Sequence, residues 1–148
     1  MKNKFIGYRH TGIITKDIEK SKYFYVNLLG FEIIQDFWDN SEYINEITGI
    51  KNASVHMIKM KTGDEFILEL LEYKSHPTEN FNFPLYNVGL MHLALRVNNI
   101  GETYEYLKSN NIKFISEPIL SSEGIAKVCF CLDPDNTRIE LVEMIKHF

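Results

Sequence analysis

Apolar and polar residues follow a helical period in two parts of the chain and a period of two in several others, and this order repeats. In the first half, a strand-like stretch that begins at His10 leads to Asp17, which can cap a helix. Phe24 and Leu28 follow at helical spacing, and Gly30 can end that helix. Three strand-like runs come next, over residues 31–36, 53–60 and 66–72. The pattern predicts the order βαβββ.

The second half predicts the same order. A strand-like stretch begins at His92 and leads to Asn99, which has the spacing of a capping box with Glu102. Asn110 and Asn111 can end that helix, because asparagine tolerates the left-handed conformation. Three strand-like runs follow here too, over residues 113–117, 126–132 and 138–144.

Two consecutive βαβββ modules predict an α+β fold in which the two mixed sheets pack side by side as an open, curved barrel. We expect a single domain over residues 1–148, with module 1 at about 5–72, a linker at 73–87 and module 2 at about 88–148. Residues 38–51 have no counterpart in the second half. Their uneven pattern predicts a short helix or a loop over a pocket.

Composition excludes several classes of protein. The formal charge is −4, and the 16 basic residues are scattered rather than clustered, so nucleic-acid binding is not expected. No apolar run approaches the roughly 20 residues of a membrane span, and the first residues lack the apolar core of a signal peptide. Cys129 and Cys131 would point the same way from a strand, which predicts buried, reduced thiols rather than a disulfide. We therefore expect a cytoplasmic protein with no membrane contact.

One pairing of residue types occurs in both halves: a histidine that opens a strand, and a glutamate inside a later Glu-Leu-x-Glu stretch. A single such histidine is more often an ordinary core or surface residue, and a single such glutamate can simply face solvent. The repetition favours a divalent-metal site, because imidazoles and carboxylates are the ligands of such ions. The residues are His10 and Glu69 in the first half, and His92 and Glu140 in the second.

The second glutamate of each Glu-Leu-x-Glu stretch lies three residues further along the predicted strand. Glu72 and Glu143 should therefore point away from Glu69 and Glu140, and we expect them to be solvated surface residues.

Three stretches, residues 10–32, 91–97 and 133–143, resemble the vicinal oxygen chelate superfamily, which has the glyoxalase/bleomycin resistance protein/dioxygenase fold. The ligand pattern is most similar to bacterial-type glyoxalase I and methylmalonyl-CoA epimerase. The resemblance implies one divalent metal ion per site, which can be nickel, cobalt, zinc, manganese or iron. It implies four ligands: His10, Glu69, His92 and Glu140.

The resemblance also implies a reaction. The two members with the most similar ligand pattern move a proton on a carbon beside a carbonyl, while the metal stabilises the enolate. This reaction predicts a lyase, an epimerase or an isomerase that acts on a small molecule. Glu140 would take the proton, with Glu69 as its partner on the opposite face. Three alternatives remain open: an Fe(II) extradiol-type dioxygenase using the histidines and Glu140, an antibiotic-modifying transferase, and a non-catalytic ligand-binding protein like the bleomycin-resistance members. Glu69 argues against the first two, and four intact ligands argue against the third. Family members are commonly homodimers.

Four further residues are candidates for contact with the substrate. Arg96 and Arg138 fall on the same strand faces as His92 and Glu140 by alternation, where a cation can meet an anionic group. The same positions also suit ordinary surface arginines. His56 and Trp38 are candidate pocket residues, with core packing as the alternative.

Overall fold

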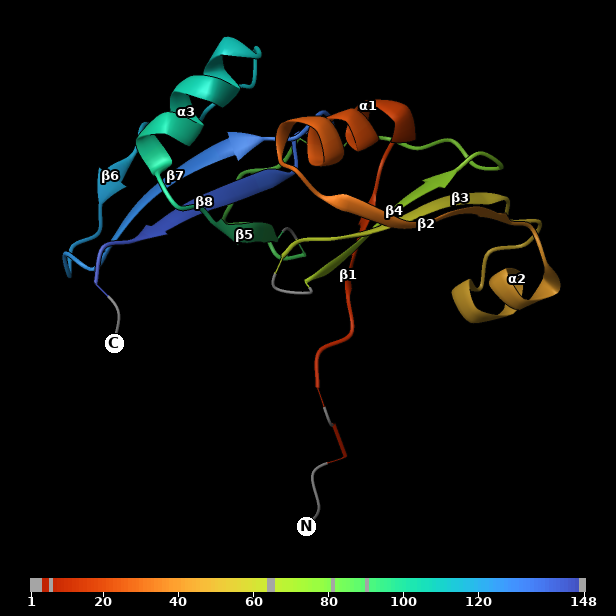
Figure 1. Ribbon diagram of the computed structural model, residues 1–148. Helices are drawn as coiled ribbons and strands as arrows, with labels where there is room; N and C mark the ends of the chain where they lie inside the picture. Colours follow the sequence, from red (N-terminus) through yellow and green to blue (C-terminus); the bar gives the residue numbers. More distant parts are fainter. Residues whose placement is uncertain (1–3, 6, 64–65, 81, 90, 147–148) are drawn as a thin grey trace. The chain divides into compact units, whose positions relative to one another are not determined.

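The computed structural model describes residues 4–5, 7–63, 66–80, 82–89 and 91–146. The chain divides into two compact units, Met1–Glu79 and Asn80–Phe148, and each is described by itself. Each unit contains one mixed four-stranded sheet (Figure 1).

Unit 1 has the strand order β1-β4-β3-β2, with β1 parallel to β4 and the other neighbours antiparallel. The sheet is open, with β1 and β2 at its edges. In chain order its elements are β1 (Thr11–Ile14), α1 (Ile18–Lys22), the π-helical turn η1 (Tyr23–Leu28), β2 (Glu32–Asp39), α2 (Glu42–Thr48), β3 (Val55–Lys61) and β4 (Ile67–Tyr73).

The helix predicted between Asp17 and Gly30 is present. The Asp17 side chain accepts a hydrogen bond from the Lys20 backbone N–H at 3.2 Å and so caps α1, which continues without a break into η1. Phe24 and Tyr25 are buried on this helical segment. Gly30 then adopts a left-handed φ of 78°, which lets the chain turn into β2.

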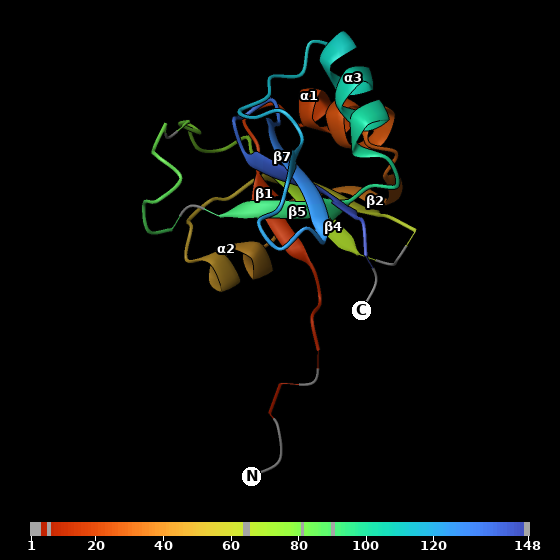
Figure 2. The same ribbon diagram turned by 90° about the vertical axis from the view of Figure 1, so that its left-hand side faces the viewer.

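The two faces of the unit 1 sheet are covered by different helices. In β3 and β4, Lys59 lies opposite Glu69 and His56 opposite Glu72, so these two pairs occupy opposite faces. The Glu72 face meets the start of α1 at Ile18. On the Glu69 face, Ile44 of α2 packs with Val55 and Met57 of β3. In both views α1 and α2 lie on opposite sides of this sheet (Figures 1 and 2). Residues 38–51 therefore do include the predicted short helix.

Unit 2 repeats this arrangement with the order β5-β8-β7-β6, in which β5 is parallel to β8. The Asn99 side chain accepts from the Glu102 N–H at 3.0 Å, and Asn111 has a left-handed φ of 63°, so both predicted helix ends are confirmed. In chain order the elements are β5 (His92–Arg96), α3 (Ile100–Ser109), β6 (Ile119–Leu120), β7 (Ala126–Leu132) and β8 (Arg138–Met144).

The prediction of a strand at residues 113–117 is wrong. The β6 strand is displaced to Ile119–Leu120, and an isolated bridge between Phe114 and Cys131 is what remains at the predicted place. The ladder is interrupted because the Phe130 N–H donates to the Ser116 side-chain oxygen at 3.1 Å instead of to a backbone carbonyl.

Both cysteines are buried and free, as predicted. They lie on one face of β7, where Cys129 is opposite Leu141 and Cys131 is opposite Ile139. Burial raises the pKa of Cys129 to about 11 and that of Cys131 to about 12, so both stay protonated at neutral pH.

The predicted α+β class with two βαβββ modules is confirmed, and α2 is an addition to the first module. Over the described ranges, no helix is long and apolar enough to cross a bilayer.

Candidate metal centre

In unit 1, His10 and Glu69 lie side by side. His10 immediately precedes β1, and Glu69 sits in the middle of β4, where it is in register with Gly12 of β1. The distance from His10 Nε2 to Glu69 Oε2 is 3.3 Å. The Glu69 side chain is 9% exposed and that of His10 is 36% exposed, so the imidazole is the part of this pair that meets solvent.

Unit 2 builds the same pair. His92 is the first residue of β5, and Ala94 is in register with Glu140 of β8. His92 Nε2 lies 3.0 Å from Glu140 Oε2, with side-chain exposures of 44% and 22%. The His92 ring also makes an edge contact with Phe130, with 5.4 Å between the ring centroids.

The shared feature of the pairs is their register. In both units, the residue two positions after the histidine is opposite the glutamate across a parallel strand pair. Parallel pairing with this offset carries both side chains to the same face of the sheet, because residues two apart on a strand share a face. The histidine and glutamate are thus brought together by strand pairing in each unit.

The donor atoms fit a divalent ion. Two ligand atoms about 2.1 Å from one ion, and about 90° apart, are about 3 Å from each other, as the nitrogen and oxygen of each pair are. The same spacing suits a direct hydrogen bond. Within the part of the chain that the structure describes, no group of three or more His, Cys, Asp or Glu residues is assembled as a metal site. Among its described residues, each unit therefore brings together two candidate ligands.

Arg96 and Arg138 lie on the face that strand alternation predicts. Arg138 is in register with His92, and Arg96 follows His92 on the same side of β5. The Arg138 guanidinium donates a hydrogen bond to the backbone carbonyl of Phe83 at 2.9 Å, which ties the segment before β5 to the start of β8.

His56 and Trp38 are not beside Glu69. Both lie on the opposite face, because Trp38 pairs with His56 and His56 with Glu72. His56 Nε2 is 2.6 Å from Asp36 Oδ1, and its ring stacks on Trp38 with 4.7 Å between centroids. A substrate at Glu69 would have the sheet between itself and this cluster, so we correct the prediction and leave His56 and Trp38 out of the site.

Lys59 is a residue that the sequence analysis missed. It is directly opposite Glu69 on β3, and its ammonium lies 5.6 Å from the centre of the Phe37 ring. Alternation along the third strand already separates Lys59 from His56, but only the pairing of β3 with β4 shows which of the two shares a face with Glu69. The equivalent position opposite Glu140 is Phe130.

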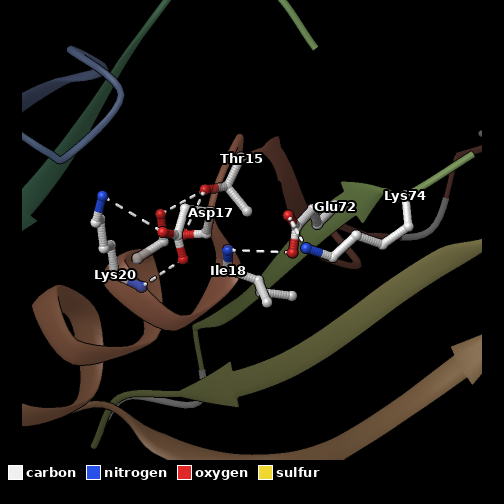
Figure 3. Close-up of polar contacts among 7 residues, drawn as sticks. Thr15, Asp17, Ile18, Lys20, Glu72 and Lys74 are labelled. Carbon is white, nitrogen blue, oxygen red and sulfur yellow. Dashed lines mark hydrogen bonds and ion pairs between the residues drawn. The ribbon is translucent and has the colours of Figure 1, made fainter. Parts of the chain in front are cut away.

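The prediction that Glu72 and Glu143 are solvated surface residues is wrong for Glu72, and Glu143 is only partly exposed. Glu72 is 4% exposed, accepts a hydrogen bond from the Ile18 N–H at 3.3 Å, and pairs with Lys74 at 2.6 Å (Figure 3). Its hydrogen bond to Lys74 raises the pKa of that lysine. Glu143 accepts from the Ile100 N–H at 2.9 Å. Both do point away from the first glutamate of their stretch, and there each contacts the start of a helix, with Glu72 buried and Glu143 partly exposed.

Comparison with known proteins places residues 7–141 within the model of the Glyoxalase/Bleomycin resistance protein/Dioxygenase superfamily. The chain is 30% identical over 135 residues to the uncharacterized protein YwkD of Bacillus subtilis, covering 90% of this chain and 94% of that protein. It is 27% identical over 136 residues to the lactoylglutathione lyase of Salmonella typhimurium, covering 90% of each.

A solved structure has the same fold. The crystal structure of a glyoxalase family protein from Bacillus cereus superposes with a TM-score of 0.88 over 98% of both chains, at 20% sequence identity. At 20% sequence identity, this similarity supports the assignment of the fold and nothing more.

Proposed function

Because the chain belongs to the Glyoxalase/Bleomycin resistance protein/Dioxygenase superfamily, we propose that it is a metal-dependent lyase or isomerase that moves a proton on a carbon beside a carbonyl group. The observation that carries this proposal is the repeated histidine–glutamate pair, held in the same register in both units. The similarity to a lactoylglutathione lyase, which covers 90% of each chain, supports a lyase reaction.

The proposed cofactor is one divalent ion per site, nickel, cobalt, zinc, manganese or iron, with His10, Glu69, His92 and Glu140 as its proposed ligands. When bound, such an ion acts as a Lewis acid and stabilises negative charge on a substrate oxygen. The neutral imidazoles donate nitrogen lone pairs, and the two carboxylates offset the charge of the ion.

Glu140 is the proposed proton acceptor, and Glu69 is its partner. The Glu140 side chain is 22% exposed against 9% for Glu69, so its carboxylate is the more accessible to a substrate carbon. A carboxylate serves as a general base when it lies within about 3 Å of the proton that it takes. Arg96 and Arg138, on the face of Glu140, are proposed to bind an anionic group of a small-molecule substrate. We also propose a homodimer as the working assembly.

Metal titration tests the ligand set. Chelator-treated protein is titrated by calorimetry with nickel, cobalt, zinc and manganese, beside alanine variants of the four ligands. We expect binding that every one of these substitutions weakens by at least tenfold. His76→Ala is the matched control, because this exposed histidine contacts Ser75 and belongs to neither pair. Binding that survives loss of Glu69 or Glu140 contradicts the four-ligand set.

Activity assays test the reaction. The loaded protein is given hemithioacetals and acyl-CoA esters, and a catechol panel is followed by oxygen consumption. We expect turnover of a substrate of the first two kinds and none of the catechols. Glu140→Gln keeps an oxygen donor for the metal but cannot take a proton, so it should lose turnover even when it is loaded with metal at saturating concentration. Oxygen uptake with a catechol would replace the proposal with a dioxygenase, and failure of the wild type to bind any ion would replace it with a ligand-binding protein.

A further inference from the structure

The second glutamate of each final strand reaches the start of a helix far away in sequence. Glu72 on β4 contacts the backbone N–H of Ile18, and Glu143 on β8 contacts that of Ile100, at 3.3 and 2.9 Å. Ile18 and Ile100 are the first residues of α1 and α3. The contact is thus the same in both units.

These carboxylates add to the capping of both helices. The first backbone N–H groups of a helix lack partners within the helix. The cap residues Asp17 and Asn99 bond the N–H of the third helical residue. Glu72 and Glu143 bond the N–H of the first, at the end of the helix where a negative charge is favourable.

The contact lies just beyond the strand that begins at His92 in unit 2 and directly after His10 in unit 1. β1 is a four-residue edge strand beside β4, and its last rung is the bond from the Thr15 N–H to the Leu71 carbonyl at 2.9 Å. In unit 2, the Val97 N–H bonds the Val142 carbonyl at 2.9 Å in the same way. In each case the next residue of the final strand is the capping glutamate.

A short strand at the edge of a sheet pairs with a single neighbouring strand, so its register against that neighbour can shift. A slip of two residues would keep each side chain on its face but move the histidine about 7 Å along the glutamate strand. A contact that fixes the chain immediately after the strand opposes this slip. It joins the helix start to the same strand that carries the metal-ligand glutamate.

We propose that Glu72 and Glu143 are positioning residues, which hold the histidine strands in register and so keep His10 beside Glu69 and His92 beside Glu140. The metal-binding consequence rests on the proposed function; the effect on strand register does not. Nothing in this role requires either carboxylate to touch the ion or the substrate.

Unit 1 strengthens this contact with further polar groups. The Thr15 hydroxyl hydrogen-bonds Ser21 at 2.6 Å and donates to the Asp17 carbonyl at 3.2 Å, beside the Glu72 and Lys74 ion pair (Figure 3). The chain between β1 and α1 is therefore tied both to its own helix and to β4.

The test compares alanine with glutamine at each position in the full chain. Glutamine keeps an oxygen acceptor for the helix N–H, and alanine does not. Two readouts are taken: hydrogen exchange of the β1 or β5 amides, and the affinity of chelator-treated protein for Ni²⁺. Ile44→Ala serves as a control that destabilises unit 1 through the core cluster of α2, away from the start of α1.

We expect Glu72→Ala to speed exchange in β1 and to weaken Ni²⁺ binding by about tenfold, with glutamine restoring both. Glu143→Ala should act in the same way on β5. Ile44→Ala should leave the Ni²⁺ affinity within twofold.

Two outcomes would overturn the proposal. One is faster hydrogen exchange of the strand amides without a loss of Ni²⁺ affinity, which would mean that the glutamates only cap the helices. The other is an unchanged exchange rate in both alanine variants. If the wild type binds no Ni²⁺ or other ion, the proposed function fails, and the exchange rates still decide whether these glutamates hold the register.

Discussion

The two units place a histidine beside a glutamate through the same backbone register, but the residues around each pair differ. Lys59 is opposite Glu69 in unit 1, whereas Phe130 is opposite Glu140 in unit 2. The Glu69 side chain is less than half as exposed as that of Glu140. The common part is a pair of candidate metal ligands, and the different part is the residue opposite the glutamate, a cation in unit 1 and an aromatic ring in unit 2. The difference suggests unequal roles for the two glutamates.

The sheets differ at their outer strands as well. In unit 1, β2 has eight residues and is followed by α2, which packs on the Glu69 face. In unit 2 the corresponding β6 has two residues, and no helix separates it from β7. Unit 1 therefore has an additional layer of structure on the face of its His10 and Glu69 pair.

The largest effect should come from equivalent core positions. Leu68 and Ile139 precede the two glutamates and are fully buried. Leu68→Ala and Ile139→Ala should each lower the free energy of unfolding by about 2–5 kcal/mol. If the units form one cooperative domain, both variants show a single thermal transition at a lower midpoint. The exposed Ile47→Ala is the control, and separate transitions for the two units would break the prediction of one domain.

The next effect concerns the residue opposite each glutamate. Lys59→Met removes the cation beside Glu69, and we expect KM for an anionic substrate to rise about tenfold, or about 1.4 kcal/mol, with kcat within twofold. Steady-state kinetics with a hemithioacetal of glutathione would measure this. Lys61→Met is the control, since Lys61 is on the same strand face but pairs at 3.9 Å with the exposed Glu32. A fall in kcat alone would indicate a different role for Lys59.

A smaller effect is expected where unit 1 has Gly12 and unit 2 has Ala94. A Cβ added at Gly12 would lie 3.3 Å from the Leu71 Cδ1 atom, the end of a side chain that can move by a few tenths of an ångström. Gly12→Ala should change the free energy of unfolding in urea by less than about 1 kcal/mol, and Ala94→Gly should lower it by about 0.5–1 kcal/mol. A loss above about 2 kcal/mol for Gly12→Ala would show that the two strand pairs are packed differently.

The smallest expected effect is a difference between the two helix caps in how the stability they contribute depends on pH. The hydrogen bond from the Lys20 N–H lowers the pKa of Asp17 below 3.8. The stability that Asp17 contributes is therefore present above pH 3.8 and is lost as the pH falls through the lowered pKa. Asn99 in unit 2 does not titrate. Asp17→Asn should flatten the acid side of the stability curve, measured by denaturant unfolding at a series of acidic pH values. An unchanged curve would mean that the Asp17 cap adds nothing as a charge.

Local patterns predicted much of this molecule. The caps at Asp17 and Asn99 and the buried thiols follow from residue type and near neighbours, and the structure has them. The prediction failed where a distant partner decides. The strand at 113–117 is displaced because a Ser116 side chain takes a backbone partner, and Glu72 is buried because a helix from another part of the chain begins above it.

The sequence by itself determined the two βαβββ modules and the repeated choice of histidine and glutamate, because period and capping depend on residues a few positions apart. Only the tertiary structure decided which faces of neighbouring strands coincide. That register set His10 against Glu69, brought Lys59 to the same face and placed His56 on the other. Register depends on hydrogen bonds between residues far apart in the chain, and a shift of one residue reverses every face.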